Sequence, residues 1–136
     1  MYNDKVMKTF KELKNVGSLK GANGIGKVGN AACGDIMKVY LKINEDGIIE
    51  DAKFKTFGCV AAIASTSIAT EMIKGKSIKE ALELKNSDFI QELGGLPPQK
   101  IHCSIMAEEA IKAAVEDYYK RIEKQQKNSS IDDEEE

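Results

Sequence analysis

The amino-acid sequence predicts an α+β domain: a small antiparallel β-sheet with helices packed on one face, and a long C-terminal helix. Two segments with alternating apolar and polar residues, 36–43 and 48–57, predict the strands. Helical periodicity dominates the second half of the chain, where residues 104–125 hold the longest run. Because strands come first and helices follow, an α+β arrangement is favoured over an alternating α/β fold.

The first element expected is an amphipathic helix over residues 3–15, with Val6, Phe10 and Leu13 on one stripe, ending before Gly17. Residues 17–30 are rich in glycine and are expected to be irregular or to form a sheet edge. The two alternating segments are then joined by a turn over residues 44–47, which predicts an antiparallel hairpin.

Helices follow the hairpin. Residues 61–74 predict a small-residue helix that stops at Gly75, and Ser77 with Glu80 forms a capping box for a short helix. Asn86 or Ser87 is expected to cap another short helix, and a proline pair at 97–98 predicts a rigid connector. The long helix begins after residue 103, and its apolar stripe consists of Ile111, Val115, Tyr118 and Ile122.

Length and charge place these elements in one domain with a tail. A chain of 136 residues with 42% apolar residues suits a single core. We expect one domain over residues 1–127 and a disordered acidic tail over residues 128–136, which ends in five acids. Without these acids the net charge of −2 becomes mildly positive, too weak a charge to indicate nucleic-acid binding.

The cysteine count and the absence of targeting signals indicate a reducing compartment. The N-terminal residues lack the apolar core of a signal peptide, and no apolar run approaches the roughly 18 residues of a membrane span. A cytoplasmic protein is therefore expected. Three cysteines argue against a disulfide framework there, so the thiols should be free, metal-bound or reactive.

The stretch from Gly21 to Lys27 has the spacing G-x-x-x-x-G-K of a phosphate-binding loop. Such a loop needs a buried strand before it, a helix starting at the lysine, and a serine or threonine next. The next residue is Val28, and neither flanking element is predicted. We reject the phosphate loop and expect the glycines to let the backbone bend near Cys33.

Cys33, Cys59 and Cys103 all fall at the ends of predicted elements. Cys59 and Cys103 should lie at helix N-termini, where the helix dipole favours a thiolate. His102 adjoins Cys103. Three thiolates and one imidazole form a complete tetrahedral set for iron or zinc. Asp35 could be an alternate oxygen ligand or a group that orients the ligands. Lys100 adds positive charge nearby.

Other interpretations of these residues remain open at this point. Each cysteine could be a small buried apolar residue, and the histidine could be structural. The wide spacing contains no C-x-x-C pair. It also does not separate an open, labile metal site from a closed structural one.

Four stretches of the sequence resemble a known family: GNAACGD, DAKFKTFGC, AIAS and LPPQKIHCSIMAEEAIKAAVEDY. They are similar to the IscU-type iron–sulfur cluster assembly scaffolds and to the N-terminal domain of NifU, over about residues 3 to 119. The resemblance implies a scaffold and not an enzyme. It implies that a 2Fe–2S cluster is built from iron and sulfur, that a dimer can form a 4Fe–4S cluster, and that the cluster is passed to apo-proteins.

The resemblance also implies partners and residue roles. A cysteine desulfurase supplies persulfide sulfur, and a donor such as ferredoxin supplies electrons; neither nucleic acid nor membrane is involved. By match, Cys33, Cys59, Cys103 and His102 are ligands, and Asp35 joins them or keeps the cluster labile. Cys103 is the persulfide acceptor, Lys100 supports the site from outside the ligand set, and Zn²⁺ can occupy the site in purified protein.

Two departures from the family pattern bear on function, and the N-terminal segment 12–15 also lacks the family's usual Asn-Pro-Arg. Val60 follows Cys59, where the family usually has glycine. Valine is bulkier and less flexible than glycine, which bears on the motion of this loop and on the exposure of a cluster. Gln99 interrupts the chaperone-recognition motif at Leu96–Lys100, which bears on partnership with a DnaK-type chaperone and its J-protein. The alternative function is a zinc-bound sulfur acceptor of the SufU kind, which His102 and the lack of the usual insertion disfavour.

Overall fold

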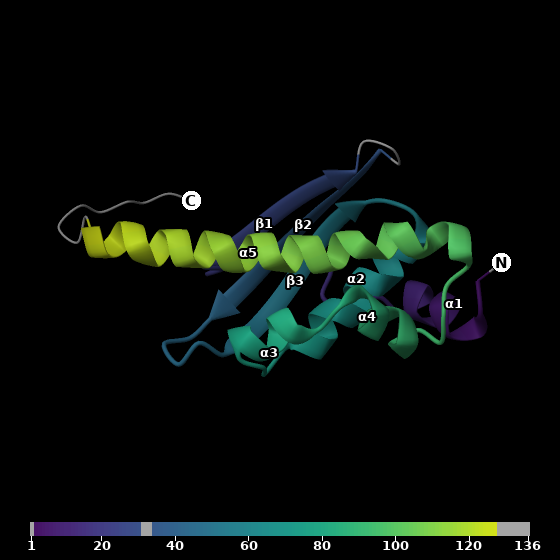
Figure 1. The fold of residues 1–136 in the computed structure, drawn as a ribbon, viewed down its shortest axis with the longest axis horizontal. Helices are drawn as coiled ribbons and strands as arrows, with labels where there is room; N and C mark the ends of the chain where they lie inside the picture. The colour runs from purple at the N-terminus through teal and green to yellow at the C-terminus, as the bar shows by residue number, and fades with distance from the viewer. Residues whose placement is uncertain (1, 31–33, 128–136) are drawn as a thin grey trace.

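A three-stranded antiparallel sheet forms the centre of the fold (Figure 1). Its strands are β1 (Gly24–Asn30), β2 (Asp35–Ile43) and β3 (Ile49–Phe57), in the order β1-β2-β3. The structure, a computed structural model, describes residues 2–30 and 34–127, and for residues 30, 102, 103 and 125–127 it describes the backbone alone. The predicted acidic tail and Cys33 therefore lie outside the described residues.

The central strand β2 confirms the alternation expected from the sequence. Met37, Val39 and Leu41 are fully buried on one face, while Lys42 and Ile36 on the other face are exposed. The predicted turn joins β2 to β3, and Gly47 adopts a positive φ of 76° there, which glycine tolerates best. The predicted hairpin is therefore confirmed.

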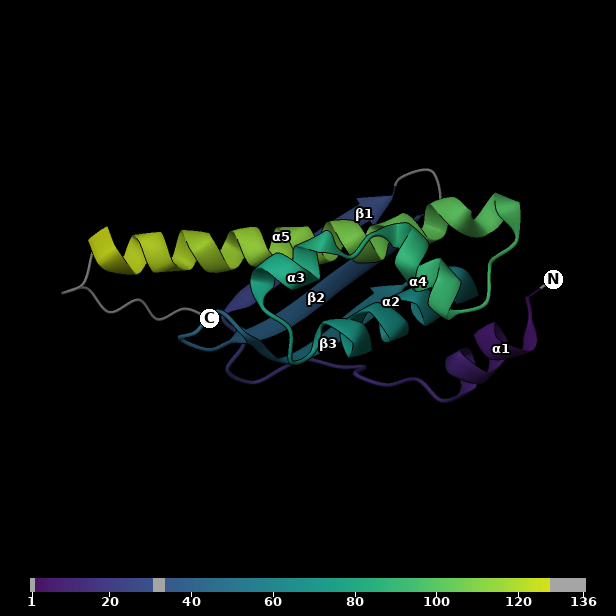
Figure 2. The same ribbon diagram turned by 60° about the horizontal axis from the view of Figure 1, so that its bottom comes forward.

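Helices cover one face of this sheet. Helix α2 (Val60–Ile73) packs on β3, and α5 (Ile101–Lys127) packs on β1 and β2. Figure 2 shows α5 and α2 in front of the strands, with the short helices α3 (Ile78–Glu83) and α4 (Asn86–Glu92) beside them. The long helix follows a 3₁₀ turn, η1 (Pro98–Lys100). The predicted α+β architecture with a long C-terminal helix is confirmed.

Two glycines of β1 let α5 approach the sheet closely. A Cβ atom on Gly26 would lie 2.4 Å from the backbone oxygen of Ala110 and from the backbone nitrogen of Ala114. A Cβ atom on Gly24 would lie 2.6 Å from the oxygen of Ala114. The expectation that these glycines serve bending near Cys33 is wrong for this pair, because both lie inside a regular strand and make room for a helix. The rejection of the phosphate loop is confirmed, since Lys27 lies within β1 and starts no helix.

The first helix, α1 (Asp4–Lys11), is shorter than predicted. Its N-cap residue Asn3 accepts a hydrogen bond from the Val6 N–H at 2.8 Å, and Val6 is fully buried against Ala64 and Leu93. Leu13 lies outside the helix and is 37% exposed, so its predicted place on the buried stripe is wrong. The chain leaves the helix early because the next residues pair with the sheet.

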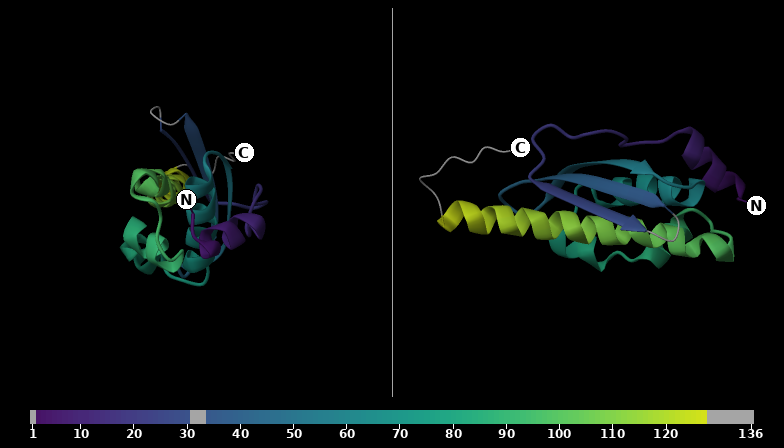
Figure 3. Two further views of the ribbon diagram at one scale, coloured as in Figure 1. Left: turned by 90° about the vertical axis from the view of Figure 1, so that its right-hand side faces the viewer. Right: turned by 90° about the horizontal axis from the view of Figure 1, so that it is seen from above.

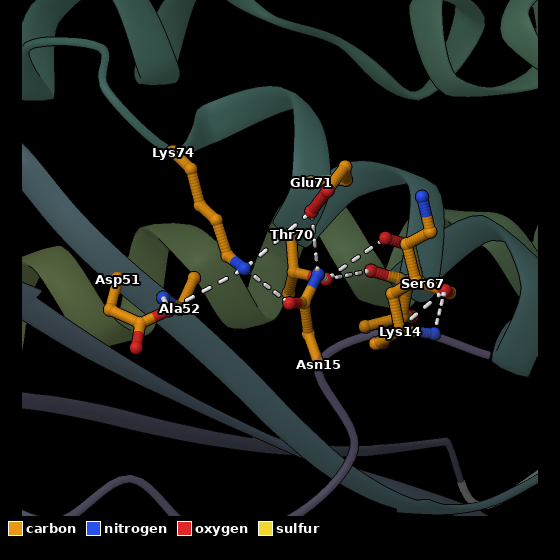
Figure 4. Close-up of polar contacts among 9 residues, drawn as sticks. Lys14, Asn15, Asp51, Ala52, Ser67, Thr70, Glu71 and Lys74 are labelled. Carbon is orange, nitrogen blue, oxygen red and sulfur yellow. Dashed lines mark hydrogen bonds and ion pairs between the residues drawn. The ribbon is translucent and has the colours of Figure 1, made fainter.

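That pairing covers the outer edge of β3. The N–H of Phe54 donates to the Asn15 carbonyl at 2.8 Å, and the N–H of Gly17 donates to the Phe54 carbonyl at 2.8 Å. Asn15 adopts a positive φ of 68°, and its side-chain amide donates to Thr70 Oγ1 at 3.1 Å (Figure 4). Lys74 donates to Asn15 Oδ1 and lies 3.5 Å from Asp51, so α2 and β3 both hold this segment.

The chain between Gly17 and β1 runs on the side of the sheet opposite α5 (Figure 3). There the Ser18 side chain hydrogen-bonds with Tyr40, which is only 7% exposed although it points away from the helices. The rest of this sheet face carries no helix of the described chain. We call it the open face.

The cap of α4 also differs from the prediction. Lys85, and not Asn86 or Ser87, is the N-cap residue, and its N–H donates to the Asp88 carboxylate at 2.7 Å. Asn86 instead links two helices: its N–H donates to Glu108 Oε1 at 2.7 Å, and its side chain accepts from the Ser104 hydroxyl. The capping box of α3, by contrast, is confirmed, since Ser77 and Glu80 exchange hydrogen bonds. Among the described residues, no helix is long and apolar enough to cross a membrane.

Candidate functional site

The register of β2 and β3 brings two predicted site residues together. Ile36 pairs with Phe57 as the last pair of this ladder. Asp35 immediately precedes Ile36, and Gly58 and Cys59 immediately follow Phe57. Residues that were predicted from separate motifs therefore lie side by side at one end of the sheet.

The carboxyl group of Asp35 lies against Gly58. A Cβ atom on Gly58 would lie 3.4 Å from Asp35 Cγ and 3.3 Å from Thr56 Oγ1. Asp35 is only 7% exposed, and its Oδ2 atom is buried without a hydrogen-bond partner among the described residues. A buried polar atom without a partner is unfavourable, and a cation or an N–H donor would remove that cost.

Cys59 is a free, half-buried cysteine at the N-cap of α2. Its backbone is extended, with φ of −78° and ψ of 171°, and its carbonyl accepts the first helical hydrogen bond from Ile63 at 3.0 Å. The predicted position at a helix N-terminus is confirmed for this cysteine. The partial positive charge of the helix end therefore faces the same region as the Asp35 carboxyl.

The first turn of α5 lies at the same end of the fold. Gly26 of β1 packs at Ala110 and Gly24 packs at Ala114, so β1 and α5 run in opposite directions. From Gly26 to the end of β1 is about 13 Å, which corresponds to about nine residues of helix. The end of β1 therefore lies toward the start of α5, where the backbone of His102 and Cys103 is found. Figure 1 shows that the strand and the helix run in opposite directions.

The helix α5 begins earlier than the sequence indicated. Cys103 does not precede the helix but is its third residue, and His102 is the second. The predicted position of Cys103 just before the helix is wrong, because the 3₁₀ turn after Pro97 leads directly into α5. Lys100 ends that turn, is half-buried, and donates its N–H to the Pro97 carbonyl at 2.8 Å.

The complete predicted ligand set is not described. Cys33 lies outside the described residues, and so do the side chains of His102 and Cys103. Among the side chains that are described, no group of three or more His, Cys, Asp or Glu residues could hold a metal ion. The fold brings together Asp35 and the segment of Cys59, and the ligand set as a whole stays a prediction.

Sequence reasoning missed the role of Gly58. The motif G-C drew attention to the cysteine alone, yet the glycine is the residue of this connection that lies against the Asp35 carboxyl, with little room for a side chain between Asp35, Thr56 and Ala62. The spacing between strand ends could have indicated this, because the hairpin register follows from the turn at residues 44–47.

The family described as the NifU-like N terminal domain matches residues 1–125 of this chain. Among similar curated proteins is the iron-sulfur cluster assembly scaffold protein IscU of Escherichia coli strain K12, 54% identical over 125 residues, which are 90% of this chain and 97% of the relative. The protein of the same name from Azotobacter vinelandii is 55% identical over 120 residues, covering 86% and 93%. The iron-sulfur cluster assembly scaffold protein IscU 1 of Archaeoglobus fulgidus is 50% identical over 132 residues, covering 97% and 82%.

Solved structures share the fold at lower identity. A NifU-like protein (N-terminal) from Brucella abortus superposes with a TM-score of 0.71 at 16% identity, covering 88% of this chain and 94% of that chain. A putative iron-sulfur cluster assembly scaffold protein for the SUF system from Fervidobacterium islandicum gives a TM-score of 0.69 at 24% identity, covering 84% and 96%. At such identities these two likenesses establish the fold alone.

Proposed function

The chain belongs to the NifU-like N-terminal domain family, and from this premise we propose that it is a scaffold for iron–sulfur cluster assembly. In this function the cluster is cargo: it is built on the protein and then passed to apo-proteins. The support comes from relatives that bear the name of such scaffolds, at 50 to 55% identity over at least 86% of this chain. The protein is accordingly proposed to act as a carrier and not as an enzyme.

The observation that carries the proposal is the carboxyl group of Asp35. Its Oδ2 atom is buried, has no hydrogen-bond partner among the described residues, and packs against Gly58 beside Cys59. A carboxylate and the chain segment that carries Cys59 thus lie next to each other, and iron accepts both oxygen and sulfur ligands. A purely structural role for Asp35 would leave the unpaired oxygen unexplained.

The proposed ligands are the thiolates of Cys33, Cys59 and Cys103, with the imidazole of His102 as the fourth. Asp35 is the exchangeable ligand. A mixed set of this kind releases its cargo more readily than four buried thiolates, because a carboxylate binds iron less strongly than a thiolate does. The cluster that we propose is 2Fe–2S; on a dimer, two of them would combine into 4Fe–4S with the uptake of two electrons from a donor such as ferredoxin.

Sulfur is proposed to arrive as a persulfide from a cysteine desulfurase. The Cys103 thiolate attacks the outer sulfur of the donor persulfide; a new S–S bond forms on Cys103, and the donor cysteine leaves as a thiolate. Two electrons from a donor such as ferredoxin then cleave that S–S bond, which releases sulfide and regenerates the Cys103 thiolate. Lys100, three residues before Cys103, would stabilise the anionic groups at this step.

A chaperone partner is proposed at the segment Leu96–Lys100, which ends at the first turn of α5. Pro97 is half-buried and Gln99 is exposed, so this segment is accessible for recognition. A partner bound there would directly contact the start of α5, whose second and third residues are His102 and Cys103.

Absorption spectroscopy tests the proposal. The full chain is incubated without oxygen with ferrous iron, cysteine and a cysteine desulfurase, beside variants Cys33→Ser, Cys59→Ser and Cys103→Ser. Charge-transfer bands in the unchanged protein, weakened in each variant, would support a cluster on these ligands. Transfer is then measured by adding an apo-ferredoxin.

Zinc needs a separate arm of the experiment, because zinc binds such ligands more tightly than ferrous iron. The protein is therefore stripped with a chelator before loading. If no bands form while persulfide accumulates only on zinc-loaded protein, the sulfur-relay function of the SufU kind replaces the scaffold. If neither bands nor persulfide form, a structural zinc domain replaces both.

A further inference from the structure

Three lysines stand in one row across the open face of the sheet. Lys27 of β1 pairs with Lys38 of β2, and Lys38 pairs with Lys55 of β3. Neighbouring strands are about 4.8 Å apart, so the three side chains emerge within about 10 Å of one another. We call them the lysine row. Like charges directly opposite each other destabilise a sheet, so this arrangement opposes folding.

No carboxylate of the described chain neutralises the lysine row. None of the three lysines forms an ion pair with a described residue, whereas the nearby Asp51 lies 3.5 Å from Lys74, the C-cap residue of α2. The Lys38 ammonium lies 5.2 Å from the ring centre of Tyr40. The positive charge of the row is therefore left for an outside partner.

The lowered pKa of the Tyr40 hydroxyl is consistent with a positive potential on this face. Burial raises the pKa of its hydroxyl, but a hydrogen bond with Ser18 and the neighbouring Lys38 and Lys55 lower it, and the net pKa is below the usual value. Ammonium groups that stabilise a phenolate would stabilise carboxylates of a partner in the same way.

An exposed apolar pair separates the lysine row from the candidate site. Ile36 and Phe57 pair directly on the open face and are 43% and 78% exposed. Asp35 and Gly58 are their next neighbours in the sequence. From the lysine row to Asp35 is therefore about 10 Å along β2.

We propose that the open face docks an acidic protein, through the lysine row and the apolar pair of Ile36 and Phe57, at the rim of the candidate site. The matching surface has carboxylates about 5 Å apart, as successive helical turns or neighbouring strands provide, beside one apolar side chain. That the docked partner exchanges cargo with the site rests on the proposed function, but the docking itself does not.

Two other anions fit the face less well. Nucleic acid is disfavoured because the row lacks arginine, of which the whole chain has only Arg121. The chain's own acids, Asp132–Glu136, follow Lys127, which lies about 25 Å along α5 from the level of Gly26. Nine further residues span at most about 30 Å and would have to reach the opposite face of the sheet, so only the last acids could approach the row.

The test is a binding measurement that needs neither iron nor sulfide. The probe is a fluorescein-labelled glutamate-rich peptide that ends in two apolar residues. A control peptide, called the serine probe, is identical except that it ends in two serines. Fluorescence anisotropy compares the unchanged full chain with Lys27→Glu/Lys38→Glu/Lys55→Glu. The matched control, Lys79→Glu/Lys120→Glu/Lys124→Glu, changes the net charge equally at exposed helix positions.

We expect the row variant to lose about tenfold in affinity at low salt and the control variant less than about twofold. Phe57→Ser should remove the advantage of the apolar probe over the serine probe. Equal losses in both lysine variants would overturn the proposal, because net charge alone would then explain binding. A single-stranded oligonucleotide of equal charge that binds about tenfold more tightly than the peptide would also overturn it in favour of nucleic acid.

A variant with the acids at 132–136 changed to their amides tests the tail. If that variant binds the peptide about tenfold more tightly than the unchanged chain, the tail occupies the row, and the proposal is wrong. The row variant is also loaded chemically with iron and sulfide. Bands equal to those of the unchanged protein would show that its site is intact, so a failure of docking is distinguished from a failure of the proposed function.

Discussion

Replacing Gly26 with alanine tests how closely α5 packs on β1. The new methyl group would lie 2.4 Å from two backbone atoms of α5, Ala110 O and Ala114 N, and 2.9 Å from Ala113 C. Comfortable contacts lie at about 3.5 to 4.0 Å, so the helix would have to retreat by about 1 Å. Backbone atoms of a helix cannot rotate away as a side chain does, and the retreat weakens every contact between α5 and the sheet.

The expected cost is about 1 to 3 kcal/mol, the usual range for overpacking. Alanine recovers part of it, about 0.4 to 1 kcal/mol, because it restricts the unfolded chain. At about 4 °C per kcal/mol for a domain of this size, the melting temperature should fall to about 4 to 12 °C below that of an alanine variant without the overlap, since both variants restrict the unfolded chain equally. Thermal unfolding followed by circular dichroism at 222 nm, with the protein free of metal, measures this fall.

Gly29→Ala is the matched control, since it lies on the same strand and the nearest atom to its new methyl group is 3.6 Å away. Its melting temperature should stay unchanged or rise slightly. If Gly26→Ala melts within about 2 °C of Gly29→Ala, the close contact between α5 and β1 is not present in solution, and the placement of His102 and Cys103 near the end of β1 fails with it.

Three further predictions follow from individual contacts. Asp35→Ala should stabilise the metal-free protein by about 1 kcal/mol in urea unfolding, because it removes a buried oxygen that has no partner among the described residues, and it should lengthen the lifetime of a loaded cluster. A less stable metal-free variant with an unchanged cluster lifetime would contradict both the unpaired oxygen and its proposed role. The pKa of Glu71 is lowered by its hydrogen bond with Asn15 and by Lys74 and Lys14, so its contribution to stability is present above the unfolded-state pKa and is lost as the pH falls through the lower folded-state pKa. Unfolding measured between about pH 3 and 6 should show this loss of stability in the unchanged protein and not in Glu71→Gln. An equal pH dependence of the two proteins would argue against the contact. Ser77→Ala should cost about 1 kcal/mol through the lost cap of α3, measured by urea unfolding, whereas Ser87→Ala, at an exposed position outside any cap, should change stability little.

Local sequence patterns predicted the elements whose signals are local. The alternation of β2 and the capping box of Ser77 and Glu80 need only neighbouring residues, and both are confirmed. The early end of α1 could not be predicted, because it depends on hydrogen bonds between Asn15 and Phe54, 39 residues apart. The requirement for glycine at position 26 could not be predicted either, because it comes from packing against a helix that begins 75 residues later.

The candidate site divides in a similar way. Cys59 was placed correctly at a helix N-terminus because glycine and small residues mark that boundary in the sequence. The contact between Asp35 and Gly58 depends on strand register, which no single motif contains. The joint placement of Cys33, His102 and Cys103 with these residues stays a prediction that the family resemblance makes.

The backbone pairing of Asn15 and Gly17 with Phe54 on the outer edge of β3 limits how two copies of the chain could associate. The Phe54 N–H and carbonyl on that edge are already bonded within the same molecule, and Thr70 and Lys74 hold Asn15 in place. A second chain therefore finds no free backbone groups at that position for a continuous intermolecular sheet. Self-association through β3 would first have to break this local structure, which directs encounters between copies away from that edge.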